Sequence, residues 1–208
     1  MPVRATFEEA ADALKRGQAV VFPTDTVYGL GVSIRATAGP DALYALKERD
    51  RGKPIAWLVG SPDDLDRYGA GVPDFARAAA ARFWPGPLTL VVRASKAVPP
   101  AFRSDAGTVG LRMPGNARAL ALIRAAGCPL ATTSANISGH PAPRSLAAVD
   151  PALASRAAAV LADDADVHDA GKSGVASTVL DCTGPRPRVL REGAITLSDI
   201  ETLSEEGK

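Results

Sequence analysis

The pattern of apolar and polar positions predicts a helix close to the start of the chain. Thr6 and Glu9 have the spacing of a capping box, and Gly17 supplies a stop signal. Between these signals, apolar residues recur at helical spacing at Phe7, Ala10, Ala11 and Leu14. An apolar run over 19–22 predicts a short buried strand, and Pro23 ends it because proline cannot donate to a sheet ladder.

Helices and strands continue to alternate along the chain. Further helices are predicted at 40–47, 74–83 and 117–126, and 61–64 has the signals of another helix start. Further strands are predicted at 55–59, 88–92, 109–112, 130–132, 158–161, 178–180 and 189–190. Because several of these strands are close enough in sequence to form hairpins, we expect a mixed sheet. The prediction is a single α/β domain over 1–208, frayed from about residue 204.

Composition and charge narrow the class of protein. With 46% hydrophobic and 23% charged residues, the 208-residue chain has the composition of an ordinary globular protein. Its net charge of +1 gives no global reason to expect nucleic acid, so any anion site must be local. Cys128 and Cys182 lack metal-ligand spacing, and no apolar run reaches membrane-spanning length. We therefore predict a protein of the reducing cytoplasm, without a membrane partner.

Common catalytic signatures are missing from the sequence. HExxH, CxxC and GxSxG do not occur, and His140 and His168 are the two histidines, so zinc catalysis and a histidine-based triad both lack parts. The run 171–173 imitates the end of a P-loop, but Asp166 stands where its first glycine should be. The glycines of 29–34 begin a dinucleotide fingerprint that fails at its last position. Covalent catalysis by a side chain is therefore not expected.

Hydroxyl, amide and cationic side chains gather instead in loops beside the predicted strand ends. They occur at 23–31, 47–49, 53–54, Thr108, Arg112, 134–136, 177–178 and Arg191. Arginine offers a planar fork to carboxylate or phosphate, lysine a compact charge, and Ser, Thr and Asn short hydrogen-bonding groups. Such a set suits the binding of polar anions at the place where α/β proteins hold their ligands.

Each of these residues also has a structural interpretation. Lys47 and Arg49 could be a solvated helix end, where the helix dipole favours cations. Ser134 and Asn136 could shape a turn. The alternating residues Thr24, Thr26 and Tyr28 could form a solvated strand edge, and Arg191 could pair with Glu192.

Seven segments between residues 23 and 193 favour the binding-site interpretation over the structural one, because they occur in a fixed order. They read PTDTVYGLG, KERDRGKP, WPGPLTLVV, GTVGLRMP, ATTSANISGHPAP, STVLD and LREG. Together they resemble the YrdC-like family of L-threonylcarbamoyladenylate synthases, in its short single-domain form. The resemblance implies a twisted α/β fold with a concave, electropositive cavity. It also implies a nucleotidyltransferase that makes threonylcarbamoyl-AMP and pyrophosphate from L-threonine, bicarbonate and ATP.

The resemblance further implies partners and residue roles. Mg²⁺ is expected to accompany ATP, and the product is expected to pass to a transferase complex that modifies the tRNA adenosine next to the anticodon. Threonine is expected to contact Thr26, Arg112, Ser134 and Ser177. ATP is expected to contact Arg49, Lys53, Thr108, Asn136, Arg144 and Arg191. Lys47 and Arg49 are expected to neutralise charge and position the reactants, Lys47 as a cationic wall of the pocket.

The sequence departs from the family pattern at two places and leaves two rival functions open. Many members have His where Leu58 stands, and many have Ser-Pro-Thr in place of 142–144. A cationic cavity could also hold RNA, tRNA included, without catalysis, which would show as steeply salt-dependent binding. The second rival function is that of a related carbamoyl-adenylate enzyme that uses carbamoyl phosphate.

Overall fold

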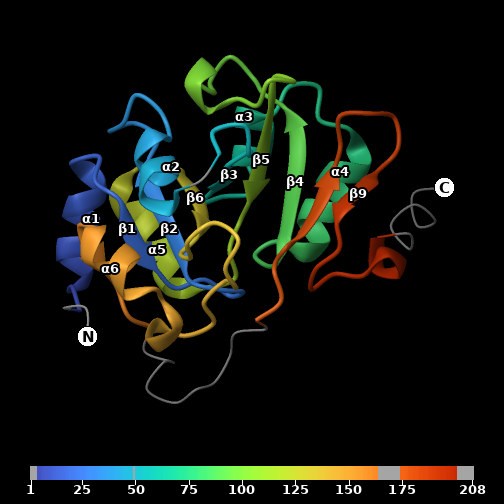
Figure 1. The fold of residues 1–208 in the computed structure, drawn as a ribbon. Coiled ribbons are helices and arrows are strands. Elements are labelled where there is room, and N and C mark those ends of the chain that lie inside the picture. Colours follow the sequence, from blue (N-terminus) through green and yellow to red (C-terminus); the bar gives the residue numbers. More distant parts are fainter. Residues whose placement is uncertain (1–3, 49, 164–173, 201–208) are drawn as a thin grey trace.

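The computed structural model describes residues 4–48, 50–163 and 174–200 (Figure 1). Its helices are α1 (Phe7–Lys15), α2 (Asp41–Lys47), α3 (Asp64–Tyr68), α4 (Asp74–Phe83), α5 (Ala117–Ala126) and α6 (Pro151–Arg156), with 3-10 turns η1 (Pro100–Phe102) and η2 (Leu146–Ala148). Its strands are β1 (Val20–Phe22), β2 (Gly29–Ser33), β3 (Ala56–Leu58), β4 (Leu88–Arg93), β5 (Thr108–Arg112), β6 (Leu130–Ser134), β7 (Ala159–Val160), β8 (Thr178–Asp181) and β9 (Arg188–Arg191).

Within the described residues, these nine strands form one sheet in the order β7-β1-β2-β6-β3-β5-β4-β8-β9. The pairs β1–β7, β3–β5 and β4–β8 are parallel, and the other five neighbouring pairs are antiparallel. The prediction of an α/β fold with a mixed sheet is therefore confirmed. Consecutive strands form the pairs β1–β2, β4–β5 and β8–β9, whereas β6 lies between β2 and β3 and β8 lies beside β4, so the sheet also joins distant parts of the chain.

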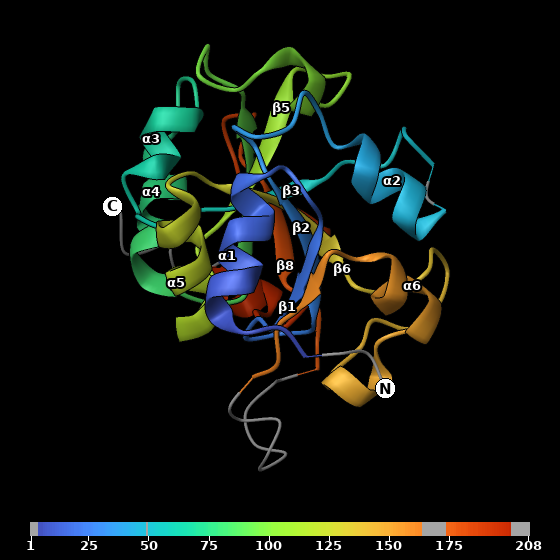
Figure 2. The same cartoon turned by 90° about the vertical axis from the view of Figure 1, so that its left-hand side faces the viewer.

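Helices cover the sheet on both faces. Leu14 of α1 and Leu122 of α5 pack on the face that carries Val20 and Phe22 of β1. In Figure 2, α1 and α5 lie on one side of the sheet, and α2 and α6 lie on the other. The second face holds the larger core, to which α2 contributes Leu43.

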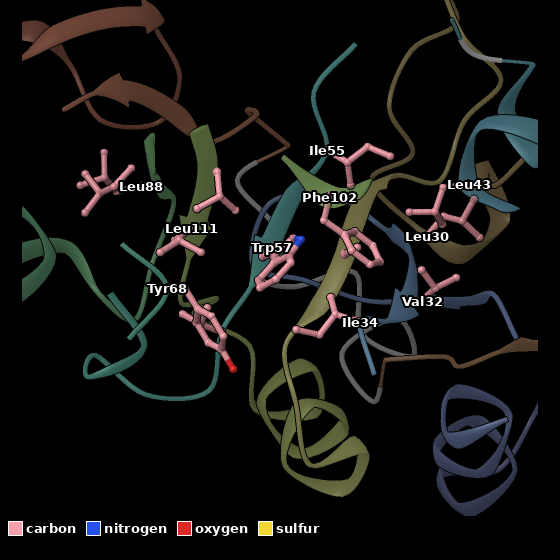
Figure 3. Close-up of a cluster of buried hydrophobic side chains, with 14 of the residues drawn as sticks. Leu30, Val32, Ile34, Leu43, Ile55, Trp57, Tyr68, Leu88, Phe102 and Leu111 are labelled. Carbon is pink, nitrogen blue, oxygen red and sulfur yellow. The ribbon is translucent and has the colours of Figure 1, made fainter. Parts of the chain in front are cut away.

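Trp57 stands at the centre of the larger core. Its ring meets Tyr68 edge-on, with the ring centroids 5.2 Å apart, and meets Phe102 edge-on at 5.6 Å (Figure 3). These contacts fasten the loop at 95–107 and helix α3 to strand β3, because aromatic pairs in this geometry add to the energy of burial. Trp84 is also buried, and its Nε1 donates to the Leu88 carbonyl at 2.8 Å.

Two elements lie outside the sequence predictions. Strand β2 is buried along its whole length, although its Gly-Leu-Gly start shows neither alternation nor enrichment in β-branched residues. Helix α6 is short, so its periodicity is weak. The sequence nevertheless contains a signal for its start. Asp150 accepts from the backbone N–H of Ala152, and Pro151 occupies the first turn.

Candidate functional site

Small side chains on one face of the sheet open a cavity of about 670 Å³. Residues paired across strands share a face: Ala56 pairs with Thr132 on one side and with Gly110 on the other, and Gly29 pairs with Ser134, which lies two residues from Thr132 on β6. A Cβ added at Gly110 would stand 3.4 Å from Thr89 Cγ2 and 3.7 Å from Ala56 Cβ. The floor therefore has no side chain larger than threonine at these positions, and the space above it is free for a ligand.

The walls of the cavity carry mainly cationic and hydroxyl groups. Among the described residues that line it, the charged side chains are Arg51, Arg103, Arg112, Arg191 and Asp105. Four guanidinium groups against one carboxylate favour an anionic ligand. The hydroxyl groups in the lining come from Thr24, Thr26, Tyr44, Thr89, Ser104, Thr108, Thr132, Thr133, Ser134 and Ser177.

Arg112, the last residue of β5, is held by three acceptors. Its Nε donates to the Gly86 carbonyl at 3.0 Å, its Nη1 to Thr26 Oγ1 at 3.1 Å, and its Nη2 to Asp25 Oδ1 at 2.6 Å. Only 6% of the residue is exposed. A guanidinium has five N–H donors, so two remain for a ligand in the cavity.

Thr26 reaches Arg112 because a hydroxyl fixes the turn between β1 and β2. Thr24 Oγ1 accepts from the backbone N–H groups of Thr26 and Val27 and donates to the Val27 carbonyl at 2.6 Å. Thr24, Thr26 and Tyr28 are all buried, and none of them lies in a strand. The interpretation of these residues as a solvated strand edge is therefore wrong.

Ser177 and Arg191 form a second polar group in the cavity wall. Arg191 donates from Nε and Nη2 to the Ser177 carbonyl, at 3.1 and 2.8 Å, and from Nη2 to Ser177 Oγ at 3.1 Å. Ser177 Oγ also lies 3.0 Å from Thr89 Oγ1. Burial lowers the pKa of Arg191, and the nearby charge of Arg112 lowers it further. The two guanidinium groups are thus close enough to repel each other in the absence of an anion.

Lys47 has neither of the positions that the sequence suggested. It is 1% exposed, so it is not a solvated helix end, and it is not among the residues that line the cavity. Its ammonium donates to the carbonyl oxygens of Ser134 and Asn136 and to Asn136 Oδ1 at 3.2 Å. The prediction that Lys47 forms a cationic wall of the pocket is therefore wrong. Lys47 is a buried residue that stabilises the end of β6 and the segment after it, because its ammonium is bound by these three acceptors.

Asn136 shapes its own loop. Its Nδ2 donates to the carbonyls of Ile137 at 2.9 Å and His140 at 2.6 Å, while its Oδ1 accepts from Lys47. Of the predicted S-x-N pair, only Ser134 lines the cavity. The structure therefore favours the turn-forming interpretation for Asn136, whose contact with ATP stays a prediction.

The other predicted site residues divide between the cavity and its surroundings. Thr108 lines the cavity and lies 2.7 Å from Ser104 through their hydroxyl oxygens. Lys53 is exposed beside the lining residues Gly52 and Pro54. Arg144 is exposed and packs closely on Gly174, and Arg49 lies outside the described residues. Thr26, Thr108, Arg112, Ser134, Ser177 and Arg191 are therefore brought together, and Leu58 also lines the cavity.

Several residues of the site were missed by the sequence analysis. Asp25 pairs with Arg112, and Thr89 pairs with Ser177, although both lie inside segments that the sequence analysis had marked. Arg51 and Asp105 line the cavity from two loops. Their neighbours could have indicated them, since Arg51 lies inside the segment KERDRGKP and Asp105 lies three residues before Thr108.

The residues that the structure describes hold neither a cluster of metal ligands nor a membrane-spanning helix. These residues contain no group of three or more His, Cys, Asp or Glu side chains that could hold a metal ion. None of the described helices combines the length and the apolar character needed to cross a bilayer.

The fold and the site together define a class: α/β proteins in which part of one face of a mixed sheet forms the floor of an arginine-lined cavity. A family model described as telomere recombination, for Sua5, YciO and YrdC, matches residues 12–193. The chain belongs to this Sua5/YciO/YrdC family.

Two relatives show how closely it resembles known members. A protein of Mycobacterium tuberculosis, named provisionally as a threonylcarbamoyl-AMP synthase, is 42% identical over 194 residues, which cover 92% of this chain and 85% of that protein. The threonylcarbamoyl-AMP synthase of Bacillus subtilis is 36% identical over 198 residues, covering 94% of this chain but 55% of that protein.

Solved structures agree with this membership. Sua5 of Pyrococcus abyssi, crystallised with L-threonine, superposes with a TM-score of 0.86 at 35% identity, over 97% of this chain and 59% of that chain. YciO of Escherichia coli superposes with a TM-score of 0.76 at 25% identity, over 93% and 92% of the two chains. This chain therefore spans a little over half the length of the Sua5 protein.

Proposed function

We propose that this chain is a threonylcarbamoyl-AMP synthase, a nucleotidyltransferase that converts L-threonine, bicarbonate and ATP into threonylcarbamoyl-AMP and pyrophosphate. The observation that carries the proposal is the buried Arg112, which is held beside Thr26 with donors to spare in a large cavity. Two relatives carry this activity in their names, and the Pyrococcus relative was crystallised with L-threonine.

Threonine is proposed to bind at the end of the cavity where Arg112 lies. Its carboxylate would accept hydrogen bonds from the two remaining N–H groups of Arg112. Such a contact is charge-assisted and directional. The hydroxyl groups of Thr26, Ser134 and Ser177, which line the same cavity, would serve as donors and acceptors for the polar groups of the amino acid. Leu58 offers an apolar contact there in place of a polar side chain.

The proposed reaction needs no protein nucleophile because the substrates react with each other. The unprotonated amine of threonine adds to the carbon of CO₂, which bicarbonate yields by losing hydroxide, and the nitrogen loses a proton to give a carbamate. A carbamate oxygen then attacks the α-phosphorus of ATP. The bond from that phosphorus to the bridging oxygen breaks, and pyrophosphate leaves with the electron pair.

Holding the reactants together is the main task of the cavity in this mechanism. Threonine carboxylate, carbamate and triphosphate are all anionic, and Arg51, Arg103, Arg112 and Arg191 offset their repulsion. Correct placement of two reactants alone can lower a barrier by about 7 kcal/mol or more. ATP is proposed to contact Thr108 and Arg191, which line the cavity, and the proposal also includes contacts from Arg49, Lys53, Asn136 and Arg144.

Mg²⁺ is proposed to enter with ATP. Asp105 is the carboxylate that lines the cavity among the described residues, so it is the carboxylate ligand available there, and the phosphates and water would supply most of the others. The ion would supply charge neutralisation at the phosphates. We further propose that the product passes to a transferase complex that acts on tRNA in the cytoplasm.

The test is an assay of pyrophosphate release with threonine, bicarbonate and ATP. Arg112→Ala should raise the KM for threonine by about 30-fold or more, because it removes one partner of a buried charge pair. Arg82→Ala, a change outside the cavity, is the matched control and should leave the KM unchanged. Failure of the wild-type protein to release pyrophosphate would overturn the proposal. Release only with carbamoyl phosphate, or salt-sensitive RNA binding without release, would identify the rival functions.

A further inference from the structure

Asp25 makes the shortest ion pair between described residues but is not among the residues that line the cavity. Its Oδ1 lies 2.6 Å from Arg112 Nη2, and the side chains of Asp25 and Arg112 are 15% and 8% exposed. The residues that line the cavity include its neighbours Thr24 and Thr26 but not Asp25 itself. A role in direct contact with a substrate is therefore not available to it in this arrangement.

The backbone around Asp25 holds its carboxylate in a fixed place. The turn that carries it is tied by Thr24 Oγ1, which accepts from the N–H groups of the two residues that follow Asp25. On the other side, a Cβ added at Gly115 would lie 3.5 Å from Asp25 Cβ, Cγ and Oδ2, so the Gly115 backbone packs against this side chain. The carboxylate is thus confined between Gly115 and Arg112.

The contacts of Arg112 show what this confinement achieves. The guanidinium is planar and rigid, so the three acceptors Gly86 O, Thr26 Oγ1 and Asp25 Oδ1 fix both its position and its rotation. All three bonds are donated by the charged guanidinium, and the bond to Asp25 is the one whose acceptor is also charged, which makes it an ion pair. Burial and the charge of Arg112 both lower the pKa of Arg191, so the position of the Arg112 guanidinium also affects its neighbour in the cavity wall.

We propose that Asp25 is a positioning residue, which orients Arg112 so that its two remaining N–H donors face the carboxylate of the amino-acid substrate. The inference rests on the proposed function and adds a residue to it. Without Asp25, the guanidinium can rotate about its side chain and move away from Arg191, and the substrate must then restore its orientation on binding. The affinity for threonine falls, while the site for ATP is left unchanged.

The decisive measurement is a double-mutant cycle on the KM for threonine in the pyrophosphate assay. Asp25→Ala should raise this KM by about tenfold with kcat and the KM for ATP little changed. Asp25→Asn should raise it by about threefold, because the amide oxygen still accepts but the charge is lost. In the Arg112→Ala background, Asp25→Ala should change the KM by less than about twofold, since Asp25 acts through Arg112.

The matched control is Asp66→Ala, which breaks an aspartate–arginine pair of 2.8 Å with Arg77, away from the cavity. It should leave the KM for threonine unchanged. A KM within twofold of wild type in both Asp25 variants would overturn the proposal, as would an equal increase with and without Arg112. If the wild-type protein releases pyrophosphate while either result is found, the positioning role fails and the proposed function stands.

Discussion

Replacing Lys47 by methionine tests whether a buried ammonium braces the segment after β6. Methionine has a similar length and fills the same space, but it cannot donate a hydrogen bond. The change removes the bonds to Ser134 O, to Asn136 O at 2.5 Å and to Asn136 Oδ1 at 3.2 Å. The Ser138 N–H, which donates to the Lys47 carbonyl at 3.0 Å, keeps its partner.

The expected size of the effect follows from two opposing contributions. Three acceptors that lose a donor cost about 1 kcal/mol each, or about 3 kcal/mol in all. The methionine variant has no ammonium to dehydrate on folding, and this gain offsets part of the lost stability. We therefore expect the free energy of unfolding to fall by about 2 kcal/mol and the Tm by about 4–8 °C.

Urea unfolding followed by tryptophan fluorescence, together with a thermal melt, measures both quantities. The control is Lys15→Met, which removes an exposed lysine whose ammonium lies 3.5 Å from Asp12. Such surface pairs contribute little, so this variant should stay within about 0.5 kcal/mol of wild type. If Lys47→Met is as stable as the control, Lys47 does not brace this segment and the reasoning fails.

Two further changes test the cavity floor and the buried thiol. Gly110→Leu should lower pyrophosphate release at least about tenfold, since its side chain would fill the space above the floor, while Gly184→Ala, with nothing within 4 Å of the added Cβ, should not. Unchanged release with Gly110→Leu would contradict the placement of the ligand. Burial, with Asp181 adding to it, raises the pKa of Cys182 from 9.0 to about 12. Above pH 9 the unfolded chain therefore loses this proton first, and the free energy of unfolding should fall by up to about 1.4 kcal/mol per pH unit. Urea unfolding at pH 8 and pH 10 should show a weaker fall in Cys182→Ala than in Cys128→Ala, and equal slopes would contradict the assignment.

The sequence by itself determined the elements whose signals are local. Helices α4 and α5 begin and end where the apolar pattern predicted, because Pro73, Asn116 and Gly127 mark their ends. Gly127 adopts a positive φ of 67°, a conformation that glycine reaches at little cost. The polar segments of the site were also visible, since loops beside strand ends carry ligands in α/β folds.

Tertiary structure alone decided which of those polar residues meet and what each one contacts. Asp25 pairs with Arg112 across 87 positions of the chain, and Lys47 reaches Asn136 across 89. Neither pairing leaves a periodic signal, because long-range contacts depend on strand order and register rather than on neighbouring residues. The same holds for the cavity floor, where Gly29, Ala56, Gly110 and Thr132 come together only once four strands pair. The chain thus encodes its helices locally, while its binding site exists only in the assembled sheet.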